Sequence, residues 1–406
     1  MNILFLGKFY PPKLIRTLAI DSKCKAGMSN HNFEMSLING LCKQKDITLK
    51  CLTIPGVYSF PYNNKRFYTR TEIYQYKTTH IHSVGFCNLP IIKEIWSTIA
   101  LILVLVKAFS KYEGDTVHVI INTPNNSLLN AVRFARIFTR KKITQTVIIP
   151  DIPSMVTAMD KQHKVKGLVL KFLNWRSMKM TSSSHGLVLL TEAMMDFIVK
   201  PVPYIVMEGI VDVTTMDLFD NDIENDDQKE IILYTGTLRK IFGIMNLIEA
   251  FKRINSTNVE LWLCGSGDAQ NDIVEATQID SRIKFYGLVS SHTALQLQNK
   301  ATILVNPRTS EGEYTKYSFP SKTMEYLLSG KTTIINRLPG IPEEYYKYVY
   351  TPKDESISAL AECISNVLEI KKEERMAKSA NGREFILTYK NSKIQTRRII
   401  DLINQY

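Results

Sequence analysis

The chain has 406 residues, which exceeds one ordinary domain of roughly 100 to 200 residues and predicts two or three domains with substantial cores. Hydrophobic residues make up 45% and charged residues 22% of the chain, a composition that excludes a disordered, fibrous or small disulfide-stapled protein. The formal net charge is +12, but residues 1–200 carry 27 Lys and Arg against 11 Asp and Glu, whereas residues 201–406 carry 24 against 28. We therefore expect the first half to face an anionic partner such as nucleic acid or an anionic membrane.

The N-terminal segment MNILFLGKFYPP has a short apolar run before Lys8 and no basic leader or small-residue cleavage site. It predicts a first strand and not a secretion signal. The longest uncharged apolar run, residues 95–106, has 12 residues, whereas a membrane span needs about 18 to 20. Six scattered cysteines without a CxxC pair are typical of reduced thiols, so we expect a cytoplasmic protein with neither disulfides nor a zinc site.

Short apolar runs rich in β-branched residues alternate with helical patterns along the chain. We expect strands in the first half at residues 2–7, 49–54, 117–122, 145–150 and 186–191, and in the second half at residues 230–236, 259–265, 282–287, 301–307 and 332–336. Helical patterns lie between them at residues 29–42, 127–138, 245–254 and 321–329. Apolar runs of this length suit strands that are buried on both faces, and the alternation predicts βαβ units in doubly wound parallel sheets, an α/β fold.

An acidic segment separates the two series of strands. Residues 212–230 contain eight Asp or Glu and a single basic residue, Lys229, so they predict an exposed linker. We therefore expect an N-terminal domain over residues 1–205, a C-terminal domain over 206–388, and a terminal amphipathic helix in 389–406 that packs back toward the first domain. Two such sheets facing each other would bind ligands in a cleft beyond the carboxyl ends of their strands.

The densest pattern of functional residues lies in residues 306–330, NPRTSEGEYTKYSFPSKTMEYLLSG. Pro320 is expected to begin a helix that carries Ser321, Lys322 and Glu325 on its polar face. The free amides of a helix N-terminus bind anions, Lys322 adds a positive charge, and Glu325 lies about 6 Å further along the axis. This offset fits a nucleotide with its diphosphate at the helix end and its ribose hydroxyls on the carboxylate. The competing interpretation is a capped surface helix with a solvated glutamate.

This pattern resembles the C-terminal signature of family 4 of the GT-B glycosyltransferases, also called glycosyl transferases group 1. Members are retaining enzymes that use nucleotide sugars, have two Rossmann-like domains and need no divalent ion. The resemblance implies that Glu325 binds the ribose of the sugar donor. The first carboxylate of the signature, which contacts the transferred sugar, falls at Tyr317 and is absent, while Glu311 and Glu313 lie in the same loop out of register.

A second segment, Ile232–Phe251, resembles the strand, glycine turn and helix that open the sugar-donor domain of the family, with Gly236 in the turn. In the family an Arg and a Lys of this turn bind the diphosphate, which implies the same role for Arg239 and Lys240. The cations are shifted, because Phe242 occupies a position where the family usually has Lys. A loop cation near a helix end can neutralise a leaving diphosphate.

Weaker matches extend the resemblance over nearly the whole chain. Residues 261–268, which include Gly265, and residues 283–290 resemble the strand ends that line the nucleotide base pocket. Gly27 matches the turn in which the backbone of the family approaches the donor phosphate. Arg308 follows a strand end, and we expect it to take over a contact with the sugar or diphosphate left by the missing carboxylate.

Asp151 is the candidate for activating the sugar acceptor, because it follows a strand end and a carboxylate there could orient a hydroxyl. A turn-forming role beside Pro150 is the competing interpretation. Residues 132–142 and 164–180 mix Lys and Arg with Leu, Phe and Trp at helical spacing, as interfacial membrane helices do. Residues 95–106 could join them or form a helix buried on the sheet.

The expected function is therefore a retaining hexosyltransferase in polysaccharide or exopolysaccharide biosynthesis. It would use a UDP- or GDP-linked sugar, without a cofactor or metal, and a glycan or polyprenyl-diphosphate-linked acceptor at the inner face of the cell membrane. Nucleic acid is disfavoured because no reader motif is present. A dehydrogenase is disfavoured because no GxGxxG follows the first strand, and the DND at 220–222 lies in the acidic segment. The alternatives are a non-catalytic GT-B partner subunit, which Tyr317 favours, and a sugar-nucleotide epimerase.

Overall fold

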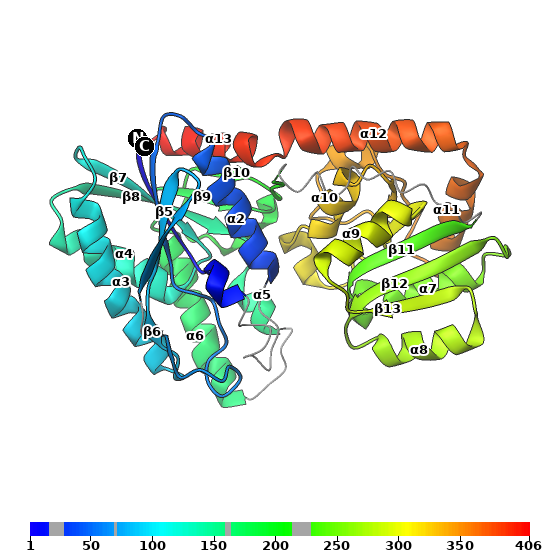
Figure 1. The fold of residues 1–406 in the computed structure, drawn as a ribbon, viewed down its shortest axis with the longest axis horizontal. Coiled ribbons are helices and arrows are strands. Elements are labelled where there is room, and N and C mark those ends of the chain that lie inside the picture. The colour runs from blue at the N-terminus through cyan, green and yellow to red at the C-terminus, as the bar shows by residue number, and fades with distance from the viewer. Residues whose placement is uncertain (16–27, 69–70, 159–163, 213–228) are drawn as a thin grey trace. The chain divides into compact units, whose positions relative to one another are not determined.

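The computed structural model describes residues 1–15, 28–68, 71–158, 164–212 and 229–406. The chain divides into two compact units, which we call unit 1 (Met1–Ile210 and Ser392–Tyr406) and unit 2 (Val211–Asn391) (Figure 1). Both boundaries lie a few residues beyond those expected at 205/206 and 388/389, and the terminal helix is counted with unit 1. Most of the acidic segment lies outside the described residues.

Unit 1 contains an eight-stranded sheet in the order β10-β9-β8-β7-β1-β2-β5-β4. Neighbouring strands are parallel except for β4 and β5, and β3 pairs with β6 in a separate short ribbon. The strands are β1 (Asn2–Gly7), β2 (Thr48–Thr53), β3 (Phe67–Tyr68), β4 (Glu72–Tyr76), β5 (Thr79–Ser83), β6 (Phe86–Cys87), β7 (Thr116–Asn122), β8 (Lys142–Ile149), β9 (Gly186–Leu189) and β10 (Tyr204–Val206). The five strands expected in the first half are confirmed. The strands from β3 to β6, and β10, were not predicted, because they are short and carry few consecutive apolar residues.

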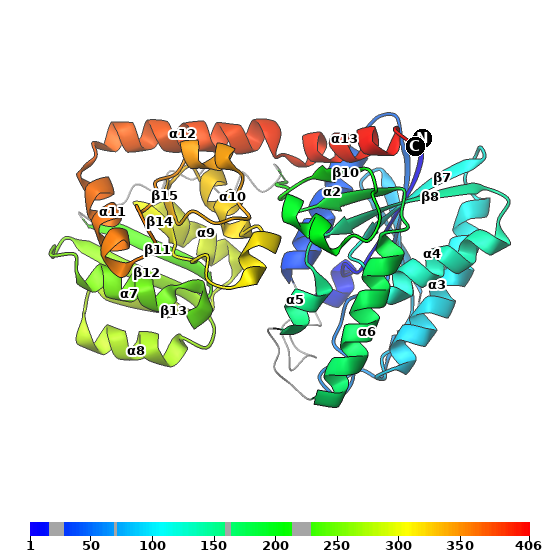
Figure 2. The same cartoon turned by 180° about the vertical axis from the view of Figure 1, so that it is seen from behind.

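Helices cover both faces of this sheet. On one face, α2 (Met28–Cys42) packs against α13 (Ser392–Ile403), and on the other α3 (Ile92–Ser110), α4 (Asn126–Ala135) and α6 (Lys164–Thr181) lie side by side (Figure 2). The short helices are η1 (Arg136–Phe138), α5 (Pro153–Ala158) and η2 (Glu192–Phe197). Alternate residues of each strand point to opposite faces, so both layers find an apolar surface.

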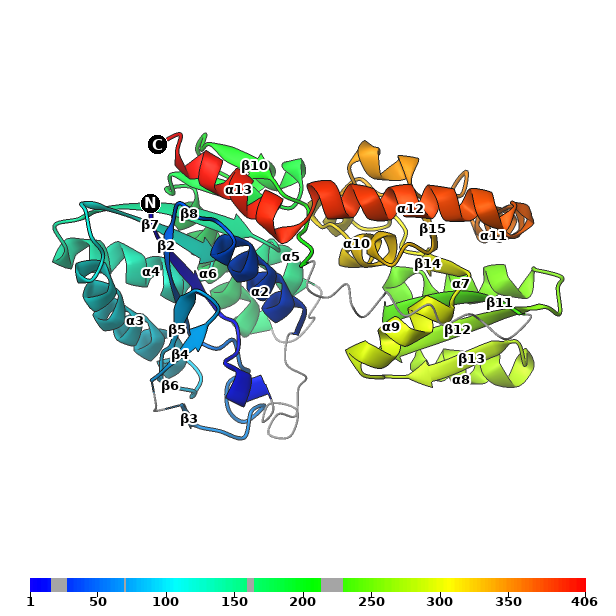
Figure 3. The same ribbon diagram turned by 45° about the horizontal axis from the view of Figure 1, so that its top comes forward.

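Unit 2 is a five-stranded, wholly parallel sheet in the order β13-β12-β11-β14-β15 (Figure 3). Its strands are β11 (Glu230–Thr237), β12 (Val259–Ser266), β13 (Ile283–Gly287), β14 (Ile303–Asn306) and β15 (Thr332–Ile335). All five were expected. The helices and 3-10 turns are η4 (Lys240–Phe242), α7 (Ile244–Lys252), α8 (Gln270–Ile279), α9 (Ser291–Lys300), η5 (Glu313–Tyr317), α10 (Ser321–Leu328), η6 (Glu343–Lys347), α11 (Ile357–Glu369) and α12 (Lys372–Tyr389).

The two faces of the unit 2 sheet have separate cores. Helices α7, α8 and α11 bury apolar side chains against one face, around residues such as Ile232 and Leu261. Helices α9 and α10 cover the other face, around Leu233, Leu304 and Tyr326, and α12 packs on α10. Burial on both faces explains the apolar runs of the central strands β11 and β14, whereas the edge strand β13 alternates between buried and less buried residues. The predicted α/β class with doubly wound parallel sheets is confirmed.

None of the described helices combines the length and the apolar character that a membrane span requires. The apolar run at residues 95–106 lies within α3, where Leu101, Leu105 and Phe109 are buried against unit 1. The other side of the same helix is exposed to solvent, so the apolar run is buried on one side of α3 only.

Candidate functional site

The candidate site lies at the carboxyl end of β11 in unit 2, where two glycines bring the backbone of adjacent strands together. Gly236 and Gly265 are paired neighbours on β11 and β12, and both have positive φ angles, 151° and 144°. A Cβ atom on Gly265 would lie 1.7 Å from the Gly236 carbonyl oxygen, so no larger residue fits there. A Cβ atom on Gly236 would lie 3.5 Å from Cε of Lys322. The positive φ angles and the close approach of the two strands therefore require glycine at both positions, and Lys322 of α10 packs beside Gly236 at an ordinary contact distance.

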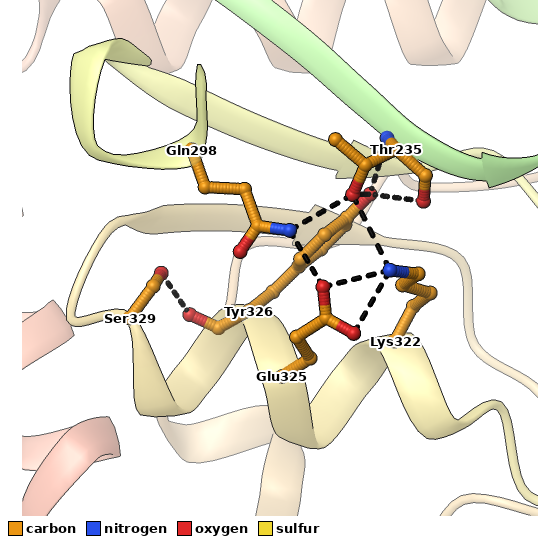
Figure 4. Close-up of polar contacts among 6 residues, drawn as sticks. All are labelled: Thr235, Gln298, Lys322, Glu325, Tyr326 and Ser329. Carbon is orange, nitrogen blue, oxygen red and sulfur yellow. Dashed lines mark hydrogen bonds and ion pairs between the residues drawn. The ribbon is translucent and has the colours of Figure 1, made fainter. Parts of the chain in front are cut away.

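An ion pair on α10 lies beside this strand end (Figure 4). Nζ of Lys322 lies 2.7 Å and 2.8 Å from the two carboxylate oxygens of Glu325, and 3.4 Å from Oγ1 of Thr235 on β11. Nε2 of Gln298 on α9 donates to Oε1 of Glu325 at 2.6 Å and to Oγ1 of Thr235 at 2.9 Å. The Lys322 and Glu325 side chains remain about one-third exposed, while Thr235 and Gln298 are buried. Buried polar groups thus hold a partly exposed ion pair in one position.

Tyr326 anchors this helix to the strand. Its hydroxyl accepts a hydrogen bond from the backbone N–H of Thr235 at 2.9 Å and donates one to the backbone carbonyl of the same residue at 3.2 Å. Burial raises the pKa of Tyr326 well above its usual value, so the hydroxyl stays protonated and keeps its donor. Ser329 donates to the Tyr326 carbonyl near the end of α10. These hydrogen bonds fix the position of α10, and therefore of Glu325, relative to the end of β11.

The N-terminus of α10 has no side-chain cap. The helix begins at Ser321, where the helical pattern at residues 321–329 was expected to start, and Pro320 is the N-cap residue with extended backbone angles and not part of the first turn. Proline has no side-chain acceptor for the first amides of the helix, and Ser321 is exposed. The expected apolar stripe is confirmed, since Met324, Leu327 and Leu328 are buried. No side chain therefore caps the first amides beside Lys322, although the Thr323 N–H donates to the Pro320 carbonyl at 2.9 Å, and a helix end of this kind favours an anion.

Two arginines flank the ring of Phe242 near this end of the sheet. The guanidinium of Arg239 lies 5.7 Å and that of Arg308 lies 5.4 Å from the ring centroid. Arg308 also lies 4.9 Å from the ring of Tyr314 and donates to Oγ of Ser318 at 2.8 Å. These cation–π contacts help to hold both guanidinium groups near the ring, and Nε of Arg239 also lies 4.0 Å from Oδ2 of Asp268. Phe242, where the family usually has Lys, thus positions two cations instead of supplying one.

Lys240 is already engaged by an acidic residue. Its Nζ lies 2.8 Å from Oδ1 of Asp272 on α8, and its backbone N–H donates to Oδ1 of Asp268. The hydrogen bond with Asp272 raises the pKa of Lys240 and lowers that of Asp272. Of the two cations expected in the glycine turn, Arg239 contacts Phe242, and Lys240 is directed to α8.

The loop before α10 carries no carboxylate in the place of the missing one. Tyr317 is buried at 5% exposure, with Nζ of Lys316 4.7 Å from its ring centroid. Glu313 is exposed and pairs with Lys316 at 3.7 Å, and Glu311 is also exposed. Neither glutamate contacts the Lys322–Glu325 pair.

The remaining predicted residues lie elsewhere. Asp151 is exposed in a bend beyond the end of β8 in unit 1, and Gly27 lies outside the described residues. In the described part of the chain, no group of three or more His, Cys, Asp or Glu side chains is arranged to hold a metal ion. The DND at residues 220–222 is not described.

Sequence reasoning identified Lys322, Glu325 and Gly236 but missed Thr235, Gln298 and Tyr326. Thr235 and Tyr326 lie next to predicted residues, and a buried tyrosine hydroxyl needs a partner, so neighbouring polar positions were a usable signal. Gln298 lies on a helix without any motif, and only the packing of α9 on β11 places it against Glu325.

Comparisons with known proteins identify a family model that matches part of the chain. Residues 229–369 match the model of the family described as glycosyl transferases group 1. A search of curated proteins found no match. The match lies within unit 2, and the matched residues include the whole Lys322–Glu325 network.

Solved structures match over the whole chain. Sucrose-phosphate synthase from Thermosynechococcus elongatus has a TM-score of 0.61 at 15% identity, covering 100% of this chain and 99% of that chain. The catalytic domain of starch synthase IV from Arabidopsis thaliana, bound to ADP and acarbose, has a TM-score of 0.65 at 9% identity with the same coverage. Anabaena Alr3699/HepE in complex with UDP has a TM-score of 0.63 at 15% identity, covering 100% of both chains. The predicted GT-B fold with two Rossmann-like domains is confirmed.

Proposed function

We propose that the protein is a glycosyltransferase that transfers a sugar from a nucleotide diphosphate sugar. The observation that carries this proposal is the Lys322–Glu325 ion pair beside the uncapped N-terminus of α10, within a glycosyl transferases group 1 domain. Structural neighbours crystallised with UDP or with ADP and acarbose support it. A scaffold has no use for a partly exposed ion pair supported by buried polar groups.

In this proposal the ion pair exchanges partners when the sugar donor binds. Glu325 accepts hydrogen bonds from the ribose hydroxyls, and Lys322 turns from the carboxylate to the diphosphate at the end of α10. Gln298 and Thr235 keep the carboxylate in place during the exchange, because both are buried and bonded to each other. A charge-assisted hydrogen bond from Lys322 to phosphate offsets the free energy that is lost when its ion pair with Glu325 separates.

The leaving diphosphate is stabilised by cations. Arg308 and Arg239 supply positive charge near the ring of Phe242, and the uncapped N-terminus of α10 adds its partial positive charge. Negative charge grows on the diphosphate as the glycosidic bond breaks, so preorganised cations lower the barrier. Lys240 starts from its ion pair with Asp272 and contributes less. Retention follows if the acceptor attacks from the face that the diphosphate leaves, and no metal is needed when arginine and lysine carry this charge.

Unit 1 holds the acceptor in this proposal, with Asp151 as the candidate to orient an acceptor hydroxyl. A glycan or a polyprenyl-diphosphate-linked sugar is the proposed acceptor class, in the assembly of a polysaccharide. The proposed donor carries UDP or GDP.

One observation favours a second candidate, a non-catalytic partner of another glycosyltransferase. Tyr317 stands where the first carboxylate of the family signature falls, and its burial leaves no carboxylate there to contact the transferred sugar. This candidate keeps the fold without turnover.

Purified protein incubated with a panel of UDP- and GDP-sugars tests the two candidates. We expect stabilisation of the protein in a thermal-shift assay and slow hydrolysis of one donor, both lost in Glu325→Ala. Glu249→Ala is the matched control, because Glu249 is a partly exposed glutamate of unit 2 that pairs with Lys252 on its own helix. Stabilisation without hydrolysis or transfer supports the partner subunit. An altered sugar nucleotide without an acceptor product indicates an epimerase, and no stabilisation by any nucleotide refutes the proposal.

A further inference from the structure

Helix α3 of unit 1 is apolar on two opposite sides. One side is buried, and the other exposes five large apolar side chains at helical spacing, which we call the α3 ridge: Ile92, Ile95, Trp96, Ile99 and Leu103. Trp96 is 54% exposed, whereas Trp262 in the unit 2 sheet is 8% exposed. A continuous exposed apolar stripe of this length is unusual on a soluble surface and marks an interaction site.

Helix α6 carries a second exposed stripe, which we call the α6 ridge and which consists of Leu168, Phe172 and Trp175. These residues are spaced four and three apart, so they share one side of the helix. The rings of Phe172 and Trp175 lie 6.0 Å apart, and Nζ of Lys179 lies 4.9 Å from the Trp175 ring. Two of the three tryptophans of the chain are thus more than half exposed, one on each ridge.

The two ridges lie at corresponding ends of their helices. Helices that connect parallel strands run antiparallel to them, so their N-terminal ends lie at the carboxyl edge of the sheet, where ligands of α/β proteins bind. The α3 ridge occupies the first 12 residues of α3, and the α6 ridge lies in the first 12 of α6. Helix α4 contacts both helices, so the ridges belong to one helical layer (Figure 2).

Basic residues accompany the ridges without acidic ones. Residues 126–142 contain five Lys or Arg and residues 164–181 contain five, and neither segment contains Asp or Glu. Helix α3 adds Lys93 and Lys107 against Glu94. Among the described side chains, the exposed cations of these segments are Lys107, Arg133, Arg140, Lys142, Lys171 and Lys179. The layer is therefore apolar and cationic at the same time.

We propose that the α3 and α6 ridges of unit 1 dock on the surface of an anionic lipid bilayer. Apolar and aromatic side chains enter the interface between head groups and acyl chains, and the neighbouring cations bind the lipid head groups. Tryptophan suits this position because its ring is apolar and its N–H is polar. A second copy of this chain fits the surface poorly, because two layers of the same positive charge repel each other.

Docking in this way places a membrane beside the carboxyl edge of the unit 1 sheet. An acceptor attached to a lipid would then reach that edge without leaving the bilayer. This last step alone depends on the proposed function, whereas lipid binding by the ridges does not.

Vesicle flotation combined with tryptophan fluorescence tests the docking. The probes are vesicles of phosphatidylcholine alone and vesicles in which part of the lipid is phosphatidylglycerol. We expect the whole protein to float only with the anionic vesicles, less at high salt, with a blue shift of its emission and quenching by brominated acyl chains. The double variant Trp96→Ser/Trp175→Ser is expected to reduce the bound fraction roughly tenfold, and Lys171→Glu/Lys179→Glu by a similar factor.

Two matched variants control for changes in charge and apolar surface. Ile137→Ser/Phe138→Ser removes exposed apolar residues of η1, outside both ridges, and Lys347→Glu/Lys372→Glu reverses exposed cations of unit 2. Both are expected to bind like the wild type. Absence of wild-type flotation overturns the proposal, as does unchanged binding of the ridge variants. Self-association in sedimentation that is lost in the ridge variants, without flotation, would identify a second copy as the occupant instead. A nucleotide thermal shift in the same samples keeps failure of docking separate from failure of the proposed function.

Discussion

The carboxyl ends of strands β1 and β11 are similar in construction, but their charged side chains differ in burial and in hydrogen-bond partners. Each ends at or beside a glycine that lies close to a charged side chain, Gly7 near Glu34 and Gly236 near Lys322. A Cβ atom on Gly7 would lie 2.3 Å from Oε2 of Glu34. In unit 1 the charged group is the fully buried carboxylate of Glu34 on α2, and in unit 2 it is the partly exposed ammonium of Lys322 on α10.

Their partners differ as well. Glu34 accepts hydrogen bonds from the backbone N–H groups of Lys8 and Phe9 and from Nδ2 of Asn122 at the end of β7, at distances of 2.8–3.1 Å. The protein itself thus occupies the amides beyond β1. At β11 the amides of α10 have no side-chain cap, and Nζ of Lys322 contacts the carboxylate of Glu325 and the hydroxyl of Thr235. A strand end whose polar groups are satisfied internally serves the fold, and one whose groups remain available serves a ligand.

The largest effect is expected from Glu34→Ala. The substitution leaves three buried donors without their acceptor, which costs about 4 kcal/mol in the free energy of unfolding. The melting temperature measured by circular dichroism should fall by roughly 10 °C. Glu113→Ala, which removes an exposed glutamate of unit 1, serves as the control. A fall of only a degree or two would show that Glu34 does not hold the β1 loop.

Glu34 also predicts a pH dependence. Burial raises its pKa from 4.5 to about 7, although Asn122 and the backbone N–H groups of Lys8 and Phe9 oppose the shift. Because the folded pKa exceeds the unfolded one, this stabilisation is fully present below pH 4.5 and is lost as the pH rises through about 7. The loss is about 3 kcal/mol by pH 8.5. Urea unfolding across this range should show that slope in the wild type and a flatter curve in Glu34→Gln, and parallel curves would contradict the prediction.

Lys322→Ala tests the other strand end. It should weaken UDP or GDP binding about 30-fold, since one charge-assisted hydrogen bond to phosphate is lost. Binding of the corresponding nucleoside should not weaken, because Glu325 keeps its contact with Gln298. Isothermal titration with both ligands measures the difference, with Lys347→Ala as an exposed control. Equal losses for nucleotide and nucleoside would show that Lys322 acts only by positioning Glu325.

The smallest effect is expected from Lys240→Ala. Lys240 is exposed and paired with Asp272, and exposed ion pairs contribute little to stability. The melting temperature should hardly change, and nucleotide affinity should fall less than about threefold. A loss as large as that of Lys322→Ala would mean that Asp272 releases Lys240 to the diphosphate when the ligand binds.

Local patterns determined much of this protein. All ten predicted strands are present, because each apolar run has the length and β-branched content of a strand buried on both faces. Lys322 and Glu325 were placed on one polar face of a helix by the period of 3.6 residues, since residues three apart are neighbours there. The helical pattern of residues 164–180 is confirmed as well, since α6 covers Lys164–Thr181.

Only the tertiary structure decided which groups those side chains meet. Gln298 lies 27 residues before Glu325 and 63 after Thr235, and no local period relates them. They meet because α9 packs on β11 and Tyr326 fixes α10 to the same strand. Packing likewise decided that one apolar side of α3 is buried and the other exposed, because only one side of a helix can face the sheet. Sequence spacing sets the direction of a side chain on its own element, and its partners depend on which elements the fold brings together.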